Sequence, residues 1–167
     1  MEKWMKAHDS LEPVKQIIDR LPAKTTVVYT YGVWDLLHPG HVILLSRAKE
    51  LGDFLIVGVV ADDQVAKLKG SDRPVQKTKD RLFVVGSLRC VDAAIPQALY
   101  DPSDELKYLK RINILTKGDD WTNIPGTDTI HALGGKLVKL GYSQGFSTSQ
   151  TISKLTGKSV GKHGEPA

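Results

Sequence analysis

The stretch Thr25-Thr-Val-Val-Tyr-Thr-Tyr-Gly-Val-Trp-Asp-Leu-Leu-His-Pro-Gly-His41 decides the fold of this chain. Its first seven residues are mostly β-branched or aromatic, which predicts a strand over residues 25–31. Pro39 suits the first position of a helix because it has no N–H to leave unpaired. The stretch is therefore read as a strand, a loop and a helix, with His38 and His41 where the helix begins.

The same alternation continues along the chain. Strands are expected at residues 25–31, 54–60, 92–95, 112–116 and 136–140. Helices are expected at residues 11–21, 39–51, 80–90, 103–111 (with Ser103 as the N-cap), 128–133 and 148–155. This order predicts an α/β fold, a Rossmann-like doubly wound five-stranded parallel sheet with helices on both faces. Ligands of such sheets bind beyond the carboxyl ends of the strands, so residues that directly follow strands are the candidates for function.

Length and composition exclude several classes of protein. The chain has 167 residues, and 23 basic against 19 acidic side chains give a net charge of +4. The basic residues are spread along the sequence, which argues against nucleic acid as a partner. No apolar run approaches the roughly 20 residues that span a membrane, and no signal peptide is visible, so a cytoplasmic protein without a membrane partner is expected. The single cysteine, Cys90, excludes an internal disulfide framework and a multi-cysteine metal site.

The organisation expected from these patterns is one compact domain with short flanking segments. Residues 1–24 are expected to form an N-terminal helical extension, residues 25–156 the main domain, and residues 157–167 a flexible tail with few apolar side chains.

The two histidines form a candidate anion site. Their spacing points both side chains toward one spot, and Gly40 removes a side chain between them. The N-terminus of a helix already favours an anion through its free N–H groups and its dipole. Taken alone, the pair is equally compatible with two exposed or hydrogen-bonded histidines that have no function. A metal site is disfavoured because no third ligand lies at a suitable spacing.

Further blocks give this pattern a family resemblance. His-x-Gly-His between a strand and a helix resembles the signature of the nucleotidyltransferase superfamily, and Thr30 to His41 looks like its first block. Residues 46–53 and the stretch Gly145-Phe-Ser-Thr-Ser149 resemble later blocks, in family order. The resemblance covers residues 25–156.

Two branches of that superfamily compete. Arg89-Cys-Val-Asp92 and Lys117-Gly-Asp-Asp-Trp121 are similar to blocks of cytidylyltransferases, the second to glycerol-3-phosphate cytidylyltransferase. Lys69-Gly-Ser-Asp-Arg-Pro-Val75, followed by Asp80-Arg81, looks more like the adenylyltransferase domain of bacterial ADP-heptose synthesis. Tyr142 stands where the glycerol-phosphate enzymes have an arginine, which separates this chain from them without changing the reaction class.

The resemblance implies an enzyme that transfers CMP from CTP to a small phosphorylated alcohol, sugar or phosphonate, with release of pyrophosphate. The alternative is an adenylyltransferase that uses ATP on a sugar phosphate such as heptose 1-phosphate. A nucleotide-binding module without turnover is a third reading. The family further implies Mg²⁺ bound with the triphosphate and a homodimer.

The resemblance also assigns roles to residues of this chain. His38, His41 and Lys69 are the expected catalytic residues, with Lys69 in a mobile loop. The expected nucleotide-binding residues are Tyr31, Gly32, Val33, Trp34, Gly40, Arg89, Gly118, Asp119, Phe146, Ser147, Thr148 and Ser149. Asp35, Asp120 and Trp121 are assigned to the acceptor or the base, and no residue is assigned to a metal.

Overall fold

The computed structural model describes residues 6–118, 121–141 and 148–157, which form one five-stranded sheet and seven helices. The strands are β1 (Val27–Gly32), β2 (Phe54–Val60), β3 (Ala93–Gln97), β4 (Ile114–Gly118) and β5 (Lys136–Leu140). All pair in parallel, in the order β3-β2-β1-β4-β5. The order reverses between β1 and β4, and crevices that bind ligands form at such a point.

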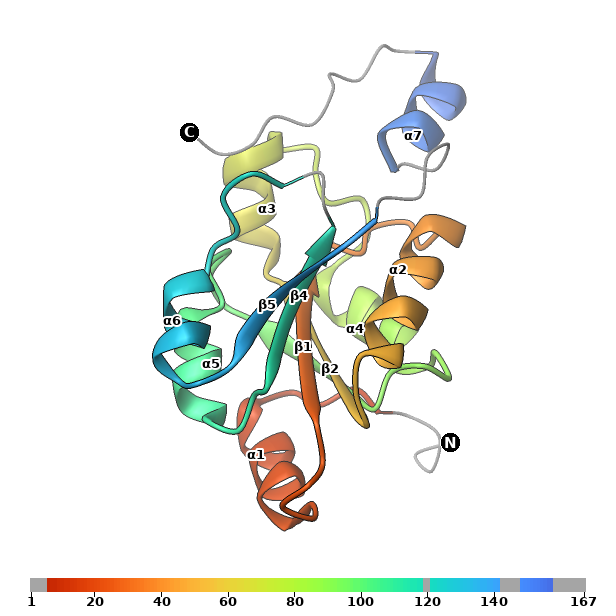
Figure 1. Ribbon diagram of the computed structural model, residues 1–167. Helices are drawn as coiled ribbons and strands as arrows, with labels where there is room; N and C mark the ends of the chain where they lie inside the picture. Colours follow the sequence, from red (N-terminus) through yellow and green to blue (C-terminus); the bar gives the residue numbers. More distant parts are fainter. Residues whose placement is uncertain (1–5, 119–120, 142–147, 158–167) are drawn as a thin grey trace.

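Helices cover both faces of the sheet (Figure 1). Their bounds are α1 (Leu11–Arg20), α2 (Pro39–Glu50), α3 (Asp62–Lys69), α4 (Thr78–Gly86), α5 (Ser103–Leu109), α6 (Thr127–Ala132) and α7 (Thr148–Thr156). One core cluster packs α2 and α4 on the sheet, and the other packs α1, α5 and α6 on the opposite face. This architecture confirms the predicted doubly wound parallel sheet.

The central strand β1 shows why both faces are covered. Every residue from Val27 to Gly32 is buried, with Tyr29 in one core cluster and Val28 in the other. Alternate residues of a strand point to opposite faces, so an uninterrupted apolar strand needs helices on both sides.

Several predicted elements differ from the structure. Residues 62–69 form α3, which was not predicted because Val65 is its one fully buried apolar residue and leaves little periodicity to detect. Helix α4 ends at Gly86 instead of residue 90, and β4 lies two residues later than expected. The N-cap of α5 is Pro102, so the assignment of Ser103 to that position is wrong. Ser103 instead bonds the Asp101 side chain.

The N-terminal segment packs on the same core as the sheet. Val14 and Ile18 of α1 are fully buried in the cluster on the α5 face. Ala7 bridges Ala94 in parallel at the edge of β3. The Arg111 guanidinium donates to the carbonyls of Ile18 and Leu21 at 2.7 Å, which satisfies orphan groups at the C-terminus of α1.

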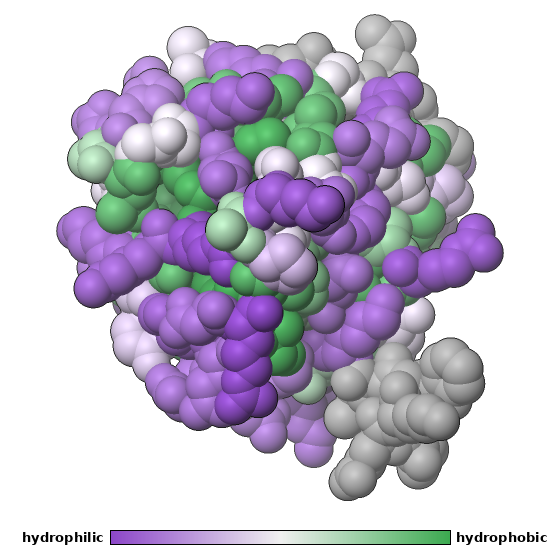
Figure 2. Space-filling model, turned by 60° about the horizontal axis from the view of Figure 1, so that its bottom comes forward, coloured by the Kyte–Doolittle hydropathy of each residue, from purple (hydrophilic) through white to green (hydrophobic). Residues whose placement is uncertain are grey.

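The strands point away from α1, so their carboxyl ends lie at the opposite end of the molecule (Figure 1). Figure 2 turns the α1 end toward the reader and shows mainly hydrophilic residues, with hydrophobic residues between them. In the part of the chain that the structure describes, no helix has the length and apolar character needed to cross a membrane.

Candidate active site

The two histidines meet where β1 gives way to α2. His38 is the N-cap of α2, and the His41 N–H donates to the His38 carbonyl at 2.9 Å. Their rings stack, with centroids 3.8 Å apart and planes 21° from parallel. The Nδ1 atoms of both rings are buried and have no hydrogen-bond partner in the described structure. The predicted convergence of the two side chains is therefore present.

Trp34 packs against His41 and supports the histidine pair. It is 4% exposed, its ring meets His41 edge to face at 5.4 Å, and its indole N–H donates to the Gly58 carbonyl at 2.9 Å. A Cβ on Gly32 would lie 2.9 Å from the Trp34 ring, so this packing requires glycine at the end of β1. Trp34, which was predicted to contact the nucleotide, is buried and packs against His41 in this structure.

Burial favours the neutral form of both imidazoles. Desolvation, together with the nearby His38 and Lys69, lowers the pKa of His41 to about 3. Desolvation also lowers the pKa of His38. The histidines therefore offer hydrogen bonds to an anion but no positive charge.

The depressed His41 pKa makes stability depend on pH. Below its ordinary value of 6.5 the unfolded chain takes up a proton at His41, whereas the folded chain resists protonation until about pH 3. The free energy of unfolding is therefore expected to fall as pH drops through this window. Urea titrations at about pH 7 and pH 5 measure the fall, and His41→Asn should reduce it by on the order of 1 kcal/mol. An equal fall in both proteins contradicts this account of His41.

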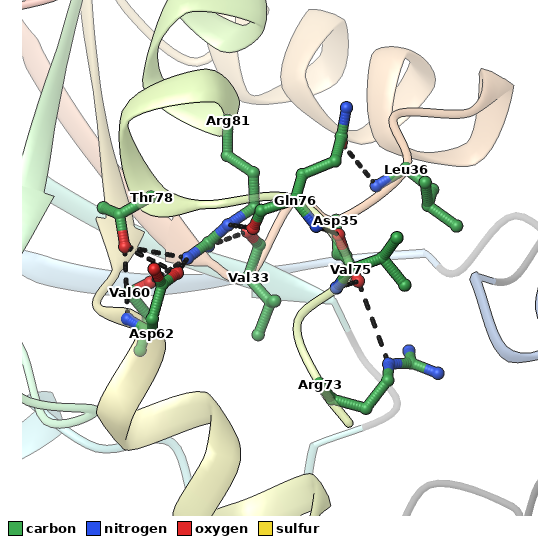
Figure 3. Close-up of polar contacts among 10 residues, drawn as sticks. All are labelled: Val33, Asp35, Leu36, Val60, Asp62, Arg73, Val75, Gln76, Thr78 and Arg81. Carbon is green, nitrogen blue, oxygen red and sulfur yellow. Dashed lines mark hydrogen bonds and ion pairs between the residues drawn. The ribbon is translucent and has the colours of Figure 1, made fainter. Parts of the chain in front are cut away.

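Asp35 joins the loop after β1 to residues 73–76 (Figure 3). Its carboxylate is 2% exposed, and it accepts the backbone N–H groups of Val75 at 2.9 Å and Gln76 at 3.0 Å. The Arg73 Nε lies 3.8 Å from it. Asp35 was assigned to the acceptor or the base, and its contacts in this structure are with the loop.

Arg81 ties this loop to the neighbouring elements (Figure 3). Its guanidinium is fully buried. It donates to the carbonyls of Val33 at 2.5 Å, Val60 at 2.9 Å and Gln76 at 2.9 Å. It also reaches the Asp62 carboxylate at 2.6 Å, so one side chain joins the ends of β1 and β2 to the starts of α3 and α4.

Lys69 is the last residue of α3, which corrects its predicted place in a mobile loop. The residue is exposed, yet partial desolvation of its ammonium group and the charge of Arg73 lower its pKa, while Asp35 acts in the opposite direction. The positive charge of Lys69 also lowers the His41 pKa, so the two side chains are electrostatic neighbours. The structure thus places Lys69 within electrostatic range of His41, which stacks on His38.

An aromatic group surrounds Lys117 at the end of β4. The ammonium group of Lys117, a buried residue, lies 3.7 Å from the Tyr31 ring centroid and 4.8 Å from that of Trp121, and it donates to the Tyr31 carbonyl at 2.7 Å. The Tyr100 and Trp121 rings stack at 5.7 Å. These half-buried rings pack on the α5 side of the sheet, opposite the core cluster that contains Trp34.

Thr148 brings the start of α7 to the same edge. Its hydroxyl is buried and donates to the Asp35 carbonyl at 2.9 Å. Gly118 is the last residue of β4, and Gly40 lies in the first turn of α2. Asp119, Asp120, Phe146 and Ser147, together with the side chain of Ser149, lie outside what the structure describes.

Arg89 was predicted to bind the nucleotide, but it lies at the end of the sheet opposite the histidines. It is exposed and precedes β3, whereas the histidines follow β1. The starts and ends of parallel strands lie at opposite edges, so Arg89 is not brought to the histidines. Its carbonyl instead meets Lys6 of the N-terminal segment.

Sequence reasoning missed three charged side chains and one aromatic residue at the site. Arg73 and Arg81 lie in or beside the 69–75 block and Lys117 in the 117–121 block, but no role was derived for any of them. Their burial is what distinguishes them, and charged side chains give no sequence signal for burial. Tyr100 carried no motif at all.

Comparison with known proteins identifies the family of this chain. The cytidylyltransferase-like family model matches residues 29–138, from β1 to β5. The chain is 42% identical over 149 residues to the bifunctional protein HldE of Caulobacter vibrioides, covering 86% of this chain and 30% of that protein. It is 34% identical over 154 residues to HldE of Helicobacter pylori strain P12, covering 89% and 31%. The chain therefore spans less than a third of these relatives.

Solved structures show the same fold. The lipopolysaccharide core biosynthesis protein of Thermoplasma volcanium superposes with a TM-score of 0.63 at 29% identity, covering 72% of this chain and 99% of that one. Pantoate-beta-alanine ligase of Francisella tularensis reaches a TM-score of 0.59 at 15% identity, covering 89% and 73%, which is a likeness of fold alone. These matches confirm the resemblance to the nucleotidyltransferase superfamily. The chain belongs to the cytidylyltransferase-like family.

Proposed function

We propose that this chain transfers AMP from ATP to a sugar phosphate such as heptose 1-phosphate and releases pyrophosphate. The observation that carries the proposal is the stacked, neutral pair of His38 and His41 beside Lys69, at the edge where parallel sheets bind ligands. Family membership supports a nucleotidyltransferase.

The relatives favour ATP over the CTP reading of the sequence. The adenylyltransferase domain of ADP-heptose synthesis, which the 69–75 block resembles, is the C-terminal domain of HldE. The CTP reading rested partly on Arg89, which lies away from the histidines. Adenylyl transfer is therefore the better supported of the two reactions.

The proposed step needs little from the protein beyond position and charge. An oxygen of the sugar phosphate attacks the α-phosphorus of ATP and forms a new P–O bond. The bond from the α-phosphorus to the bridging oxygen breaks, and its electron pair leaves with pyrophosphate. His38, His41 and Lys69 hold the α-phosphate and stabilise its growing charge, and the N-terminus of α7 at Thr148 receives the departing phosphates.

The aromatic group around Lys117 is the proposed place for the acceptor. Tyr100 and Trp121 pack on the face of the sheet opposite α2, and half-buried rings can pack against the C–H faces of a sugar. Lys117 has only hydrogen-bond donors, which suit hydroxyl and phosphate oxygens.

Mg²⁺ is proposed to arrive with the triphosphate. The described residues contain no cluster of three or more His, Cys, Asp or Glu side chains able to hold a metal ion. Both oxygens of Asp35 already accept backbone N–H groups. These residues do not form a metal cage, and Mg²⁺ commonly relies on substrate phosphates.

The sequence patterns further support a cytoplasmic protein that binds neither membrane nor nucleic acid, and the family resemblance supports a homodimer.

The nucleotide preference is tested by pyrophosphate release. The protein is incubated with Mg²⁺, heptose 1-phosphate and each of the four nucleoside triphosphates in turn. We expect kcat/KM to be highest for ATP, by at least about tenfold over CTP, a difference of about 1.4 kcal/mol. A preference for CTP restores the cytidylyl reading, and binding of nucleotide without turnover on any sugar phosphate supports the non-catalytic module.

A further inference from the structure

Arg73 is a buried cation with little compensation. Its residue exposure is 7%, and its Nε has no hydrogen bond in the described structure. Its one ion pair there is with Asp35, at a long 3.8 Å. Figure 3 shows the Nε toward Asp35 and the two terminal nitrogens on the far side, away from that carboxylate. A buried charge is costly unless a partner compensates it, so this guanidinium has capacity for an anion.

The carboxylate beside Arg73 is already engaged. Asp35 accepts the N–H groups of Val75 and Gln76, at 2.9 and 3.0 Å, and both bonds are shorter than its contact with Arg73. Asp35 therefore mainly holds the loop and orients Arg73, and it neutralises little of the charge of Arg73.

The charge of the whole site points the same way. Burial lowers the pKa of both His38 and His41, which disfavours their charged forms. Apart from Arg81, whose guanidinium pairs with Asp62, the cations that the described structure brings to this loop include Lys69 and Arg73, and the charge of Arg73 lowers the Lys69 pKa. Two neighbouring cations face one engaged carboxylate, which leaves the site positive and suited to a polyanion.

The position of Arg73 selects the part of the anion that it meets. The Asp35 side chain pairs with Arg73, while the Asp35 carbonyl accepts the hydroxyl of Thr148 at the start of α7. Arg73 is therefore linked through one residue to the helix N-terminus proposed to receive the departing phosphates.

We propose that Arg73 binds the β- and γ-phosphates of the nucleotide and neutralises the pyrophosphate as it leaves. This inference rests on the proposed function and extends it to a residue without a previous role. A planar guanidinium can bind two phosphate oxygens at once, which a lysine ammonium cannot reproduce.

The test uses inorganic tripolyphosphate, which contains the phosphates without base or acceptor. Isothermal titration of the full chain is compared with titrations of Arg73→Met and Arg73→Lys. We expect Arg73→Met to weaken binding by at least about tenfold, roughly 1.4 kcal/mol, and Arg73→Lys to recover part of it. Arg73→Met should also make the affinity less sensitive to added salt, because one charge is lost.

Lys67→Met is the matched control. Lys67 lies on the same helix as Lys69, but its side chain is 66% exposed and pairs with Asp63. Its loss should leave the tripolyphosphate affinity within about twofold, because the charges that contact the anion remain.

Two results overturn the proposal. One is unchanged tripolyphosphate affinity and salt dependence in Arg73→Met, even if its urea midpoint falls, because that pattern describes a purely structural arginine. The other is a wild-type protein that does not bind tripolyphosphate. Failure of the proposed function is distinguishable, since a protein that turns over no sugar phosphate still shows the loss of binding in Arg73→Met if the inference is right.

Discussion

His41→Ala is expected to lower kcat for pyrophosphate release by roughly 10²–10³-fold, the usual cost of losing one preorganised hydrogen-bond donor to a developing charge. His41 is held by the stacked His38 ring and by Trp34, and its buried Nδ1 has no partner in the described structure. The imidazole is therefore positioned before substrate arrives. Its neutral state means that the loss is one of hydrogen bonding, not of charge.

His41→Asn is the matched variant because an amide also presents an N–H donor. It should retain more activity than His41→Ala, and KM for ATP should change less than kcat in both, since the interaction strengthens in the transition state. Urea titrations control for folding. A His41→Ala protein that is folded and within threefold of the wild-type rate contradicts the role of the pair.

Arg81→Met is expected to lower the free energy of unfolding by about 3 kcal/mol, because loss of the buried guanidinium leaves its hydrogen-bond acceptors without donors. Three carbonyls and the Asp62 carboxylate share this one side chain. Because Arg81 joins the Val33 loop to the start of α3, the same change should misplace Lys69 relative to the histidines and reduce activity in the protein that stays folded.

Arg89→Met is the control for that experiment. Arg89 is exposed at the amino edge of the sheet, so its loss should change the free energy of unfolding by less than about 0.5 kcal/mol. Its activity should stay near that of the wild type. Urea midpoints and initial rates of the two variants are measured together. Equal effects, or a larger effect at Arg89, contradict the arrangement described for these two arginines.

The sheet and the histidine pair were predictable because their signals are local. The β-branched run of β1, the proline at the start of α2 and the apolar run of β2 each determine structure within a few residues. Parallel pairing then places residues that follow strands at one edge.

The rest of the site depends on distant contacts. Helix α3 buries little, and its start is fixed by Asp62, whose carboxylate is bonded by Thr78 and Arg81 of α4. That contact joins segments sixteen residues or more apart. The place of Lys69 at the end of α3 therefore does not follow from its neighbours in the sequence.

For Arg89, the family resemblance and the rule for parallel sheets gave different predictions. Ligands of such sheets meet residues that follow strands, whereas Arg89 precedes β3, so only the resemblance favoured a nucleotide-binding role. The sequence block that contains Arg73 was recognised, but the burial of Arg73 beside Asp35 was not predicted. The arginine proposed to contribute positive charge to the site is thus Arg73 in place of Arg89, beside the predicted Lys69.

Adenylyl transfer requires attack on the α-phosphorus of ATP by an oxygen of the sugar phosphate. Its most direct test follows radioactive phosphorus placed at either the α or the γ position of ATP, with heptose 1-phosphate as acceptor. We predict that the α label enters a nucleoside diphosphate sugar and that the γ label appears only in pyrophosphate. A γ label found on the sugar, or an α label that stays in ADP, would contradict adenylyl transfer and point to a kinase reaction.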